Sequence, residues 1–407
     1  MRGLYITAAV TMAGVSSVFA LLAELEDRYG LSTGSLGLIA GSSFVAALVA
    51  QLWLSRYADR GHARLLLQGG VVASGIGLLW FAAATELWQF VAARALLGAG
   101  IGMLVPPARR AIVLTSTDNQ GERLGTFYAA YLAGFVFGPP IASELAGLGD
   151  VRLPFLVLGA AVLLSTLSIL RIEMPEASPD VAAASPDRRV LRRLIVDRRV
   201  LAAMLVIISF RYSIGVFEPL WATHLDDLGA SRRFIAFSLT GFALPMLVIA
   251  RPAGRLTDRF GARWMSLLPA LVAAPLMATY GYTPYLWVIV VVAGVHGMTE
   301  AVLSPATQAA IADVTDDADA ASAQGLGEAA GSAASAVGAF SAPVAFEAWG
   351  AGPAWVMAGV VMAILIAVSW MLHPPVSLKR ADLVRRGRHS HRPSAWVARY
   401  PRRRRKV

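Results

Sequence analysis

Long apolar blocks separated by short polar loops run along most of this chain. Each block holds about 20 residues with few or no charged side chains. Because the bilayer interior offers no hydrogen-bond partners to an exposed backbone, such a run predicts a membrane-spanning helix. Short loops between the blocks carry Gly, Pro or charge, as at 281–284. Twelve blocks meet this description, at residues 4–23, 34–54, 65–85, 87–108, 123–144, 153–171, 200–222, 233–252, 264–282, 284–306, 322–346 and 353–372.

One longer polar stretch separates the first six blocks from the last six. Its Ser-Pro pairs and Ala-rich composition predict a linker, and its arginines from residue 188 onward predict a basic surface helix. The predicted fold class is therefore an all-α membrane protein with twelve transmembrane helices. We expect a six-helix bundle at 1–172, a linker at 173–199, a second six-helix bundle at 200–373 and a basic tail at 374–407.

The two sets of six blocks also repeat each other. Residues 55–64 align without gaps on residues 254–263, an offset of 199 positions, and the same offset carries Pro106 onto Pro305. Matches at one offset and at equivalent loops predict duplication of a six-helix unit, so we expect the two bundles to be related by a pseudo-two-fold axis. Parallel repeats of this kind recur in transporters, where the substrate path lies between the halves.

The charge pattern predicts the orientation in the membrane. Only 15% of residues are charged and 57% are apolar, whereas a soluble domain carries about 25% charged residues. The net charge of +10 comes largely from arginines in alternate loops, in the linker and in the tail. Positive charge marks the cytoplasmic side, so both termini and the linker are expected there. We expect the basic tail to contact anionic lipid headgroups and no nucleic acid.

Several classes of chemistry find no support in the sequence. The chain has no cysteine, which excludes disulfides and thiolate metal sites. It also lacks a G-x-x-x-x-G-K phosphate-binding loop, a metal-ligand cluster and a nucleophile–base arrangement. We therefore expect no cofactor, no metal and no enzymatic activity, which leaves ion gradients as the energy source for transport.

The repeated loop carries a family motif. It resembles the G-x-L-A-D-R-x-G-R-K loop of the major facilitator superfamily, a resemblance that extends over residues 1–373. In the first copy Ser and Tyr replace the motif's Gly and Leu. In the family this loop helps to close the cytoplasmic side, and an Asp–Arg pair at a helix end can bond an opposing helix terminus. The matching residues are Asp59, Arg60 and Arg64 in the first copy, and Gly254, Asp258, Arg259, Gly261 and Arg263 in the second.

Two further motifs belong to the same resemblance. The fourth block contains Arg94 followed by a Gly-rich run, similar to the R-x-x-x-G-x-G motif that the family links to proton coupling. The fifth contains Gly134, Gly138 and Pro139, similar to the G-x-x-x-G-P motif of antiporters, with Ala142 in place of the first trailing Gly. Small residues allow close helix packing, and proline bends the helix. This motif favours export over import.

Charged residues inside the apolar blocks are the candidates for substrate and proton binding. A charge at the centre of a membrane costs several kcal/mol unless it faces a partner or water. In the family, the first, fourth, seventh and tenth helices line the cavity, which implies that most of these residues surround it. Each could instead form a static structural contact, and Glu218, next to Pro219, could lie at the outer mouth. The candidates are Arg94, Arg211, Glu218, His296, Glu300 and Glu328.

These observations predict a secondary transporter that works by alternating access. We expect a proton-coupled exporter of a small molecule, functional as a monomer in a bacterial plasma (inner) membrane. An uptake symporter or uniporter for a nutrient or organic anion is the alternative, and a receptor or scaffold on the same fold is another. The buried charges argue against a scaffold, since it gains nothing from their desolvation. The two arginines would suit an anionic substrate and the glutamates a lipophilic cation.

Overall fold

The computed structural model describes residues 2–57, 62–115, 120–170, 188–316 and 319–372. Its first six helices are α1 (Arg2–Tyr29), α2 (Thr33–Tyr57), α3 (Ala63–Ala83), α4 (Leu87–Thr115), α5 (Gln120–Ala146) and α6 (Leu153–Ile169). A short basic helix, α8 (Arg188–Val196), precedes the second set. That set comprises α9 (Arg198–Asp227), α10 (Arg232–Phe260), α11 (Ala262–Thr279) with the 3₁₀ turn η2 (Tyr280–Tyr282), α12 (Leu286–Val314), α13 (Ala320–Trp349) and α14 (Ala351–Leu372).

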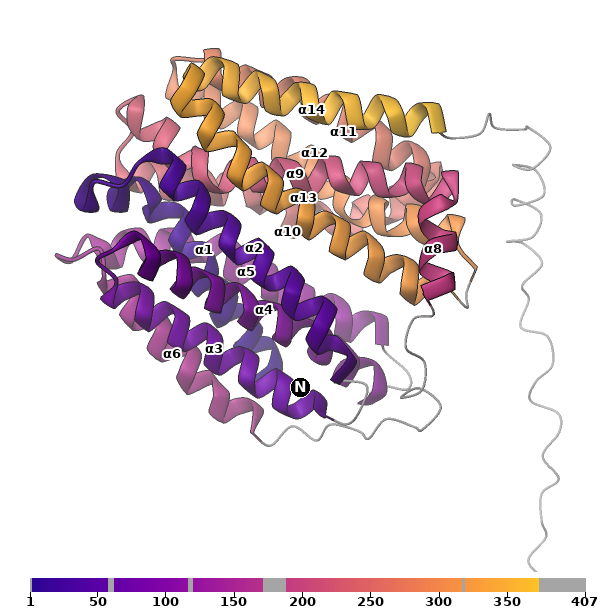
Figure 1. Cartoon of the computed structure of the whole chain (residues 1–407), viewed down its shortest axis with the longest axis horizontal. Helices are drawn as coiled ribbons and strands as arrows, with labels where there is room; N and C mark the ends of the chain where they lie inside the picture. Colours follow the sequence, from indigo (N-terminus) through magenta and orange to yellow (C-terminus); the bar gives the residue numbers. More distant parts are fainter. Residues whose placement is uncertain (1, 58–61, 116–119, 171–187, 317–318, 373–407) are drawn as a thin grey trace, which may run out of the picture.

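The expected twelve-helix architecture is confirmed. Eleven of the described helices are long and apolar enough to cross a membrane, and the twelfth, α6, is apolar but has only 17 residues. A 17-residue helix is about 25 Å long, at the lower limit for a span. Helices α1–α6 form one bundle and α9–α14 the other (Figure 1). The predicted tail lies outside the described residues, as does the linker up to residue 187.

The two bundles are built by the same helix pairings. In the first bundle, α1 packs on α5 and α6, α4 packs on α2 and α3, and α3 packs on α6. In the second bundle, α9 packs on α13 and α14, α12 packs on α10 and α11, and α11 packs on α14. A Cβ atom on Gly98 of α4 would clash with the carbonyl oxygen of Ser43 on α2, and one on Gly297 of α12 would clash with that of Phe242 on α10. Gly297 follows Gly98 by 199 positions and Phe242 follows Ser43 by 199 positions, which is the offset seen in the sequence.

Glycines bring α5 against α1. A Cβ on Gly134 would clash with the carbonyl oxygen of Ala9, and one on Gly138 with Ser16. The Ser16 hydroxyl donates back to the carbonyl of Gly134 at 3.4 Å. The antiporter-like motif thus lies in the tightest contact of the first bundle, where only glycine lets the two backbones approach.

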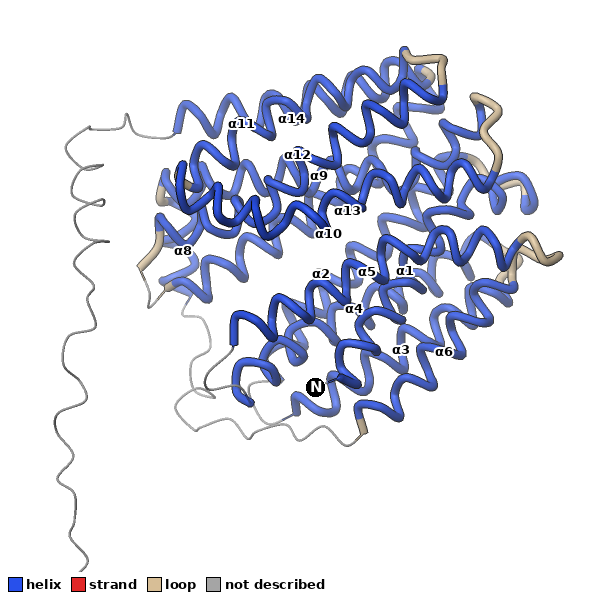
Figure 2. Tube along the Cα trace, turned by 180° about the vertical axis from the view of Figure 1, so that it is seen from behind, coloured by secondary structure: helices blue, strands red, loops and turns tan. Residues whose placement is uncertain are grey.

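The bundles meet along α2 with α13 and along α5 with α10, and α1 also packs on α9. We call the end that holds α8, the start of α1 and the end of α14 the α8 end, and the opposite end the distal end. The bundles lie close together at the distal end and diverge towards α8 (Figure 2). A polar contact also joins the bundles at the distal end. There the Glu347 carboxylate of α13 accepts a hydrogen bond from the backbone N–H of Gly34 on α2, at 2.6 Å.

Replacing Gly134 by alanine should destabilise the protein, because the added methyl group forces α5 away from α1. Overpacking of this kind costs about 1–3 kcal/mol, and we expect a lower midpoint of thermal unfolding in detergent. The control is Gly294→Ala on α12, where a Cβ would meet no atom within 4 Å. Gly294→Ala should leave the midpoint unchanged or raise it, since alanine favours a helix over glycine by about 1 kcal/mol. Equal midpoints for the two variants would contradict the close approach.

Candidate functional site

A buried ion pair joins the two bundles within the distal halves of α4 and α9. The Arg94 guanidinium on α4 binds the Glu218 carboxylate on α9 through Nη2 and Oε1, and each side chain is only 1% exposed. Arg94 Nη1 donates to the carbonyl of Val15 on α1 at 3.2 Å, and its guanidinium lies 5.3 Å from the ring centroid of Phe19. Arg94 therefore ties α1 and α4 of one bundle to α9 of the other.

The position of Glu218 resolves one alternative left open by the sequence. Its neighbour Pro219 lies inside α9, which continues to Asp227, so Glu218 does not sit at an exposed mouth. Removing one partner of a buried pair leaves an uncompensated charge and costs about 3–5 kcal/mol. Removing either side chain alone would therefore destabilise this conformation strongly.

A second polar group lies inside the α9–α14 bundle. Glu300 on α12 is 1% exposed, and its Oε1 accepts a hydrogen bond from the Ser213 hydroxyl of α9 at 2.8 Å. His296, one turn before Glu300, places Nε2 at 3.6 Å from the same oxygen. Its Nδ1 lies 3.1 Å from the hydroxyl of Tyr280. Sequence reasoning singled out the histidine and the glutamate but missed Ser213 and Tyr280, since nothing in the pattern distinguishes a serine within α9 or a tyrosine before a turn.

The structure does not bring all the predicted charges together. Arg211 is only partly buried, its chain packs against Gly331 of α13, and within the described residues it forms no ion pair with Glu218 or Glu300. Glu328 is also partly buried, and it accepts a hydrogen bond from Gln308 on α12 at 3.1 Å. These two side chains therefore lie outside the Arg94–Glu218 pair and the Glu300 group.

The described residues that flank the repeated loops lie at the α8 end. Asp59 and Arg60 fall outside the described residues, while Arg64 donates to the carbonyl of Leu170 within its own bundle. In the second copy, Gly261 has a φ of +89°, a conformation that favours glycine and that separates α10 from α11.

The other members of the second copy lie on α10 and at the start of α11. A Cβ on Gly254 would meet no atom within 4 Å, so no close approach occurs there in this conformation. Asp258 and Arg259 are exposed, with the Arg259 guanidinium 5.2 Å from the Phe260 ring. The Arg263 guanidinium lies near the rings of Trp264 and Trp370, at 5.6 and 5.7 Å.

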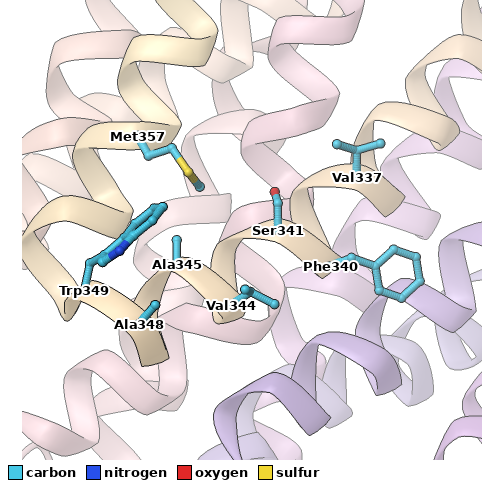
Figure 3. A pocket seen from close by; sticks show the side chains of 8 residues that line it. All are labelled: Val337, Phe340, Ser341, Val344, Ala345, Ala348, Trp349 and Met357. Carbon is cyan, nitrogen blue, oxygen red and sulfur yellow. The ribbon is translucent and has the colours of Figure 1, made fainter.

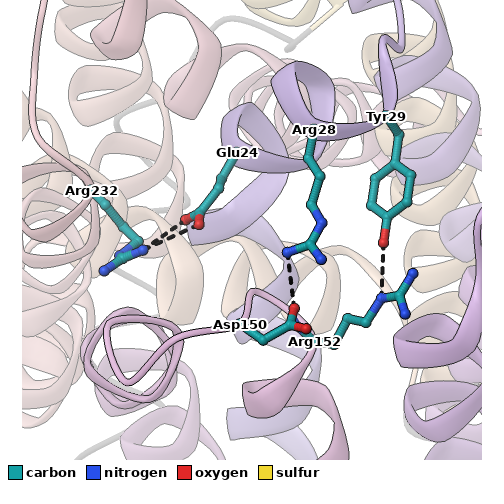
Figure 4. Close-up of polar contacts among 6 residues, drawn as sticks. All are labelled: Glu24, Arg28, Tyr29, Asp150, Arg152 and Arg232. Carbon is teal, nitrogen blue, oxygen red and sulfur yellow. Dashed lines mark hydrogen bonds and ion pairs between the residues drawn. The ribbon is translucent and has the colours of Figure 1, made fainter.

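Ion pairs at the distal end connect the bundles. Arg232 of α10 donates through Nη1 to both carboxylate oxygens of Glu24 on α1, at 3.1 Å each (Figure 4). The next residue, Arg233, binds Glu144 of α5 at 2.9 Å. In addition, the Thr223 hydroxyl of α9 donates to Glu26 of α1 at 2.9 Å. Together these contacts hold the distal ends of the two bundles against each other.

A neighbouring ion pair stays within the first bundle. Arg28 binds Asp150 at 2.9 Å, and Arg152 donates to the Tyr29 hydroxyl at 3.0 Å (Figure 4). The backbone N–H of Arg152 donates to the Asp150 carboxylate, and this bond, followed by the charge of Arg28, holds the pKa of that carboxyl below its usual value. Because both partners belong to one bundle, this pair cannot hold the two bundles together.

An apolar groove lies apart from these charges, between α13 and α14 near the distal end (Figure 3). Apolar side chains line it, among them Val344, Trp349 and Met357, with Ser341 as a polar member. A surface of this composition suits hydrocarbon and offers no charged group for an ionic ligand.

The two-bundle fold and the charged pair buried between the bundles define a membrane transporter rather than an enzyme. The chain belongs to the Major Facilitator Superfamily, whose family model matches residues 4–225 and 200–406.

Known proteins agree with this assignment. The multidrug resistance protein MdtG of Serratia proteamaculans (strain 568) is 26% identical over 284 residues, which cover 67% of each chain. Multidrug resistance protein 1 of Bacillus subtilis (strain 168) is 25% identical over 258 residues, 63% of this chain and 65% of that protein.

Solved structures show the same fold. A bacterial homolog of the human lysosomal transporter Spinster, in an inward-facing and unoccupied conformation, superposes with a TM-score of 0.80 at 14% identity, covering 91% of this chain and 95% of that one. The nucleoside transporter NupG (D323A mutant) superposes with a TM-score of 0.78 at 14% identity, covering 92% and 99%.

Neutralising Arg232 should loosen the distal end, because its pair with Glu24 spans the bundles. The pair is about one-third exposed, so its loss should destabilise the closed distal end by about 0.2–1 kcal/mol. This corresponds to at most roughly a fivefold change in the ratio of closed to open conformations. The chain has no cysteine, so spin labels can be placed directly at Leu148→Cys and Tyr285→Cys, which are exposed distal positions on different bundles. We expect Arg232→Gln to move the distance distribution towards longer separations.

The matched control is Arg28→Gln, which removes an ion pair of the same kind within one bundle. It should leave the distance distribution unchanged. An equal shift in both variants would mean that the distal ion pairs do not set the separation of the bundles.

Proposed function

We propose that this transporter exports lipophilic cations in exchange for protons. The observation that carries the proposal is the Arg94–Glu218 ion pair, which joins the bundles through a titratable carboxylate. Two multidrug resistance proteins among its relatives support export. With Arg94 neutralised by Glu218, Glu300 is a buried carboxylate that has no arginine or lysine partner among the described residues. A buried carboxylate without a basic partner favours a cation over an organic anion.

The charge pattern supports an orientation of the protein in the membrane. Arginines in the loops at the α8 end support a cytoplasmic location for that end by the positive-inside rule, with the distal end outside. The conformation described above is then inward-facing, since its bundles are held together at the outer end and diverge towards the cytoplasm.

Glu218 couples the proton to this motion. In the inward-facing state its carboxylate is ionised and paired with Arg94. Opening of the outer end separates α9 from α4, and a carboxylate that loses its cationic partner becomes easier to protonate. Return to the inward-facing state brings Arg94 back and expels the proton to the cytoplasm. A cationic substrate entering from the cytoplasm competes with Arg94 for Glu218 and weakens the link that holds this state.

The test uses everted membrane vesicles with an acidic interior and a pH-sensitive dye. Adding tetraphenylphosphonium should release protons and restore the dye signal in the wild type. Glu218→Gln and Glu300→Gln should each reduce the rate of recovery by about tenfold or more, because the amide cannot carry a proton. Glu86→Gln, an exposed glutamate before α4, serves as the control and should recover at the wild-type rate.

Other outcomes would redirect the proposal. Recovery with organic acids or sugars, and none with tetraphenylphosphonium, would show proton exchange with a different substrate class. No recovery with any compound, despite normal amounts of protein in the membrane, would contradict proton-coupled export.

A further inference from the structure

The short helix α8 lies across one end of the second bundle, at a steep angle to the spanning helices α9 and α14 (Figure 1). Only Asp197 separates its last residue, Val196, from Arg198, where α9 begins. A helix that lies across the spans and joins one of them through a single residue is at the level of the membrane surface, where amphipathic helices lie in the plane of the interface.

Two contacts fix the orientation of α8 on the second bundle. Leu194 is 5% exposed and packs with Val200 and Met204 of α9, in an apolar cluster that also includes residues of α12 and α13. The Arg193 guanidinium binds the carboxylate of Asp319, the residue before α13. Together with the direct connection to α9, these contacts attach α8 to the second bundle, so that its remaining side chains point away from the protein.

The outward side of α8 is both basic and apolar. Arg192 is exposed, and the aliphatic side chains of Ile195 and Val196 are 50% and 72% exposed. Two more exposed arginines, Arg198 and Arg199, follow in the first turn of α9. Arginines beside exposed aliphatic side chains are typical of a helix at a membrane interface, where the aliphatic groups enter the acyl region and the guanidinium groups stay among the headgroups.

The positive charge of this surface is not neutralised by the protein. None of the three exposed arginines just named forms an ion pair within the described residues. The two carboxylates that contact this segment are already engaged. Asp319 binds Arg193, and the Asp197 side chain accepts a hydrogen bond from the backbone N–H of Arg199 at 2.8 Å. The surface is therefore complementary in charge to phosphate groups of the adjacent leaflet.

We propose that the outward side of α8, with the first turn of α9, binds the headgroups of anionic phospholipids. The occupant is a lipid and not a free anion, because Ile195 and Val196 border the arginines and a lipid offers an acyl chain beside its phosphate. With the orientation proposed above, the lipid belongs to the cytoplasmic leaflet. Since α8 is attached to α9 and α13, a bound lipid anchors the second bundle to that leaflet.

The test titrates the purified full-length protein, in a nonionic detergent, with dioctanoyl-phosphatidylglycerol, a soluble anionic phospholipid. The chain has no cysteine, so Val196→Cys can carry a polarity-sensitive fluorophore next to the arginines. We expect phosphatidylglycerol to shift the emission in a saturable manner. The neutral dioctanoyl-phosphatidylcholine should give no saturable shift over the same concentrations, because it supplies an acyl chain without net negative charge.

Arg192→Gln combined with Arg198→Gln removes two exposed charges and keeps the contacts that attach α8 to the bundle. We expect the Kd for phosphatidylglycerol to rise about fivefold or more, since one arginine near an anionic surface contributes roughly that factor. The matched control is Arg403→Gln combined with Arg404→Gln, which removes the same charge from the basic tail. It should keep the Kd of the labelled parent, because the fluorophore reports on lipid bound at α8.

Several results would overturn the proposal. An unchanged Kd in the α8 variant, or a saturable shift of equal size with phosphatidylcholine, would show that the arginines do not select an anionic lipid. The same shift with inorganic phosphate would indicate a site for a free anion, and a raised Kd in the tail variant alone would assign the lipid to the tail. The titration uses no transported substrate and no proton gradient, so failure of proton-coupled export would leave its result unchanged.

Discussion

One buried ion pair, between Arg94 and Glu218, links the two bundles deep inside their shared interface. A guanidinium and a carboxylate at this depth are each costly to desolvate, and each is tolerable only because the other is present. Arg94 and Glu218 therefore constrain how α4 and α9 face each other, and the carbonyl of Val15 fixes the arginine from a third helix. In a transporter whose bundles must separate, a contact of this kind is the basis of the proton coupling proposed above.

Close helix packing holds each bundle together as a unit. Gly134 on α5, and Gly98 and Gly297 on α4 and α12, bring backbones so near that a methyl group would clash. Without a hydrophobic driving force between helices in lipid, such contacts hold a bundle together by van der Waals packing. Each bundle can then move as a unit, and changes concentrate where the bundles meet, at the Arg94–Glu218 pair and at the distal contacts of Arg232 and Arg233.

Within the second bundle the polar groups are arranged differently. Glu300, His296 and Tyr280 share one rigid unit, surrounded by aromatic rings, and contact no charged group of the other bundle in the described residues. A carboxylate between the bundles senses their separation, whereas one within a bundle keeps its neighbours throughout the cycle.

The amino-acid sequence by itself determined the twelve spans, the duplication at an offset of 199 and the presence of buried charges. The reason is that helical hydrogen bonds are local and lipid demands apolar runs of a set length. Only the tertiary structure decided that Arg94 pairs with Glu218, 124 positions away, while Arg211 on the same helix as Glu218 stays apart. The sequence also held no sign of Tyr280 beside His296. Such pairings depend on how helices distant in sequence rotate and pack against each other, and no local pattern along the chain encodes that geometry.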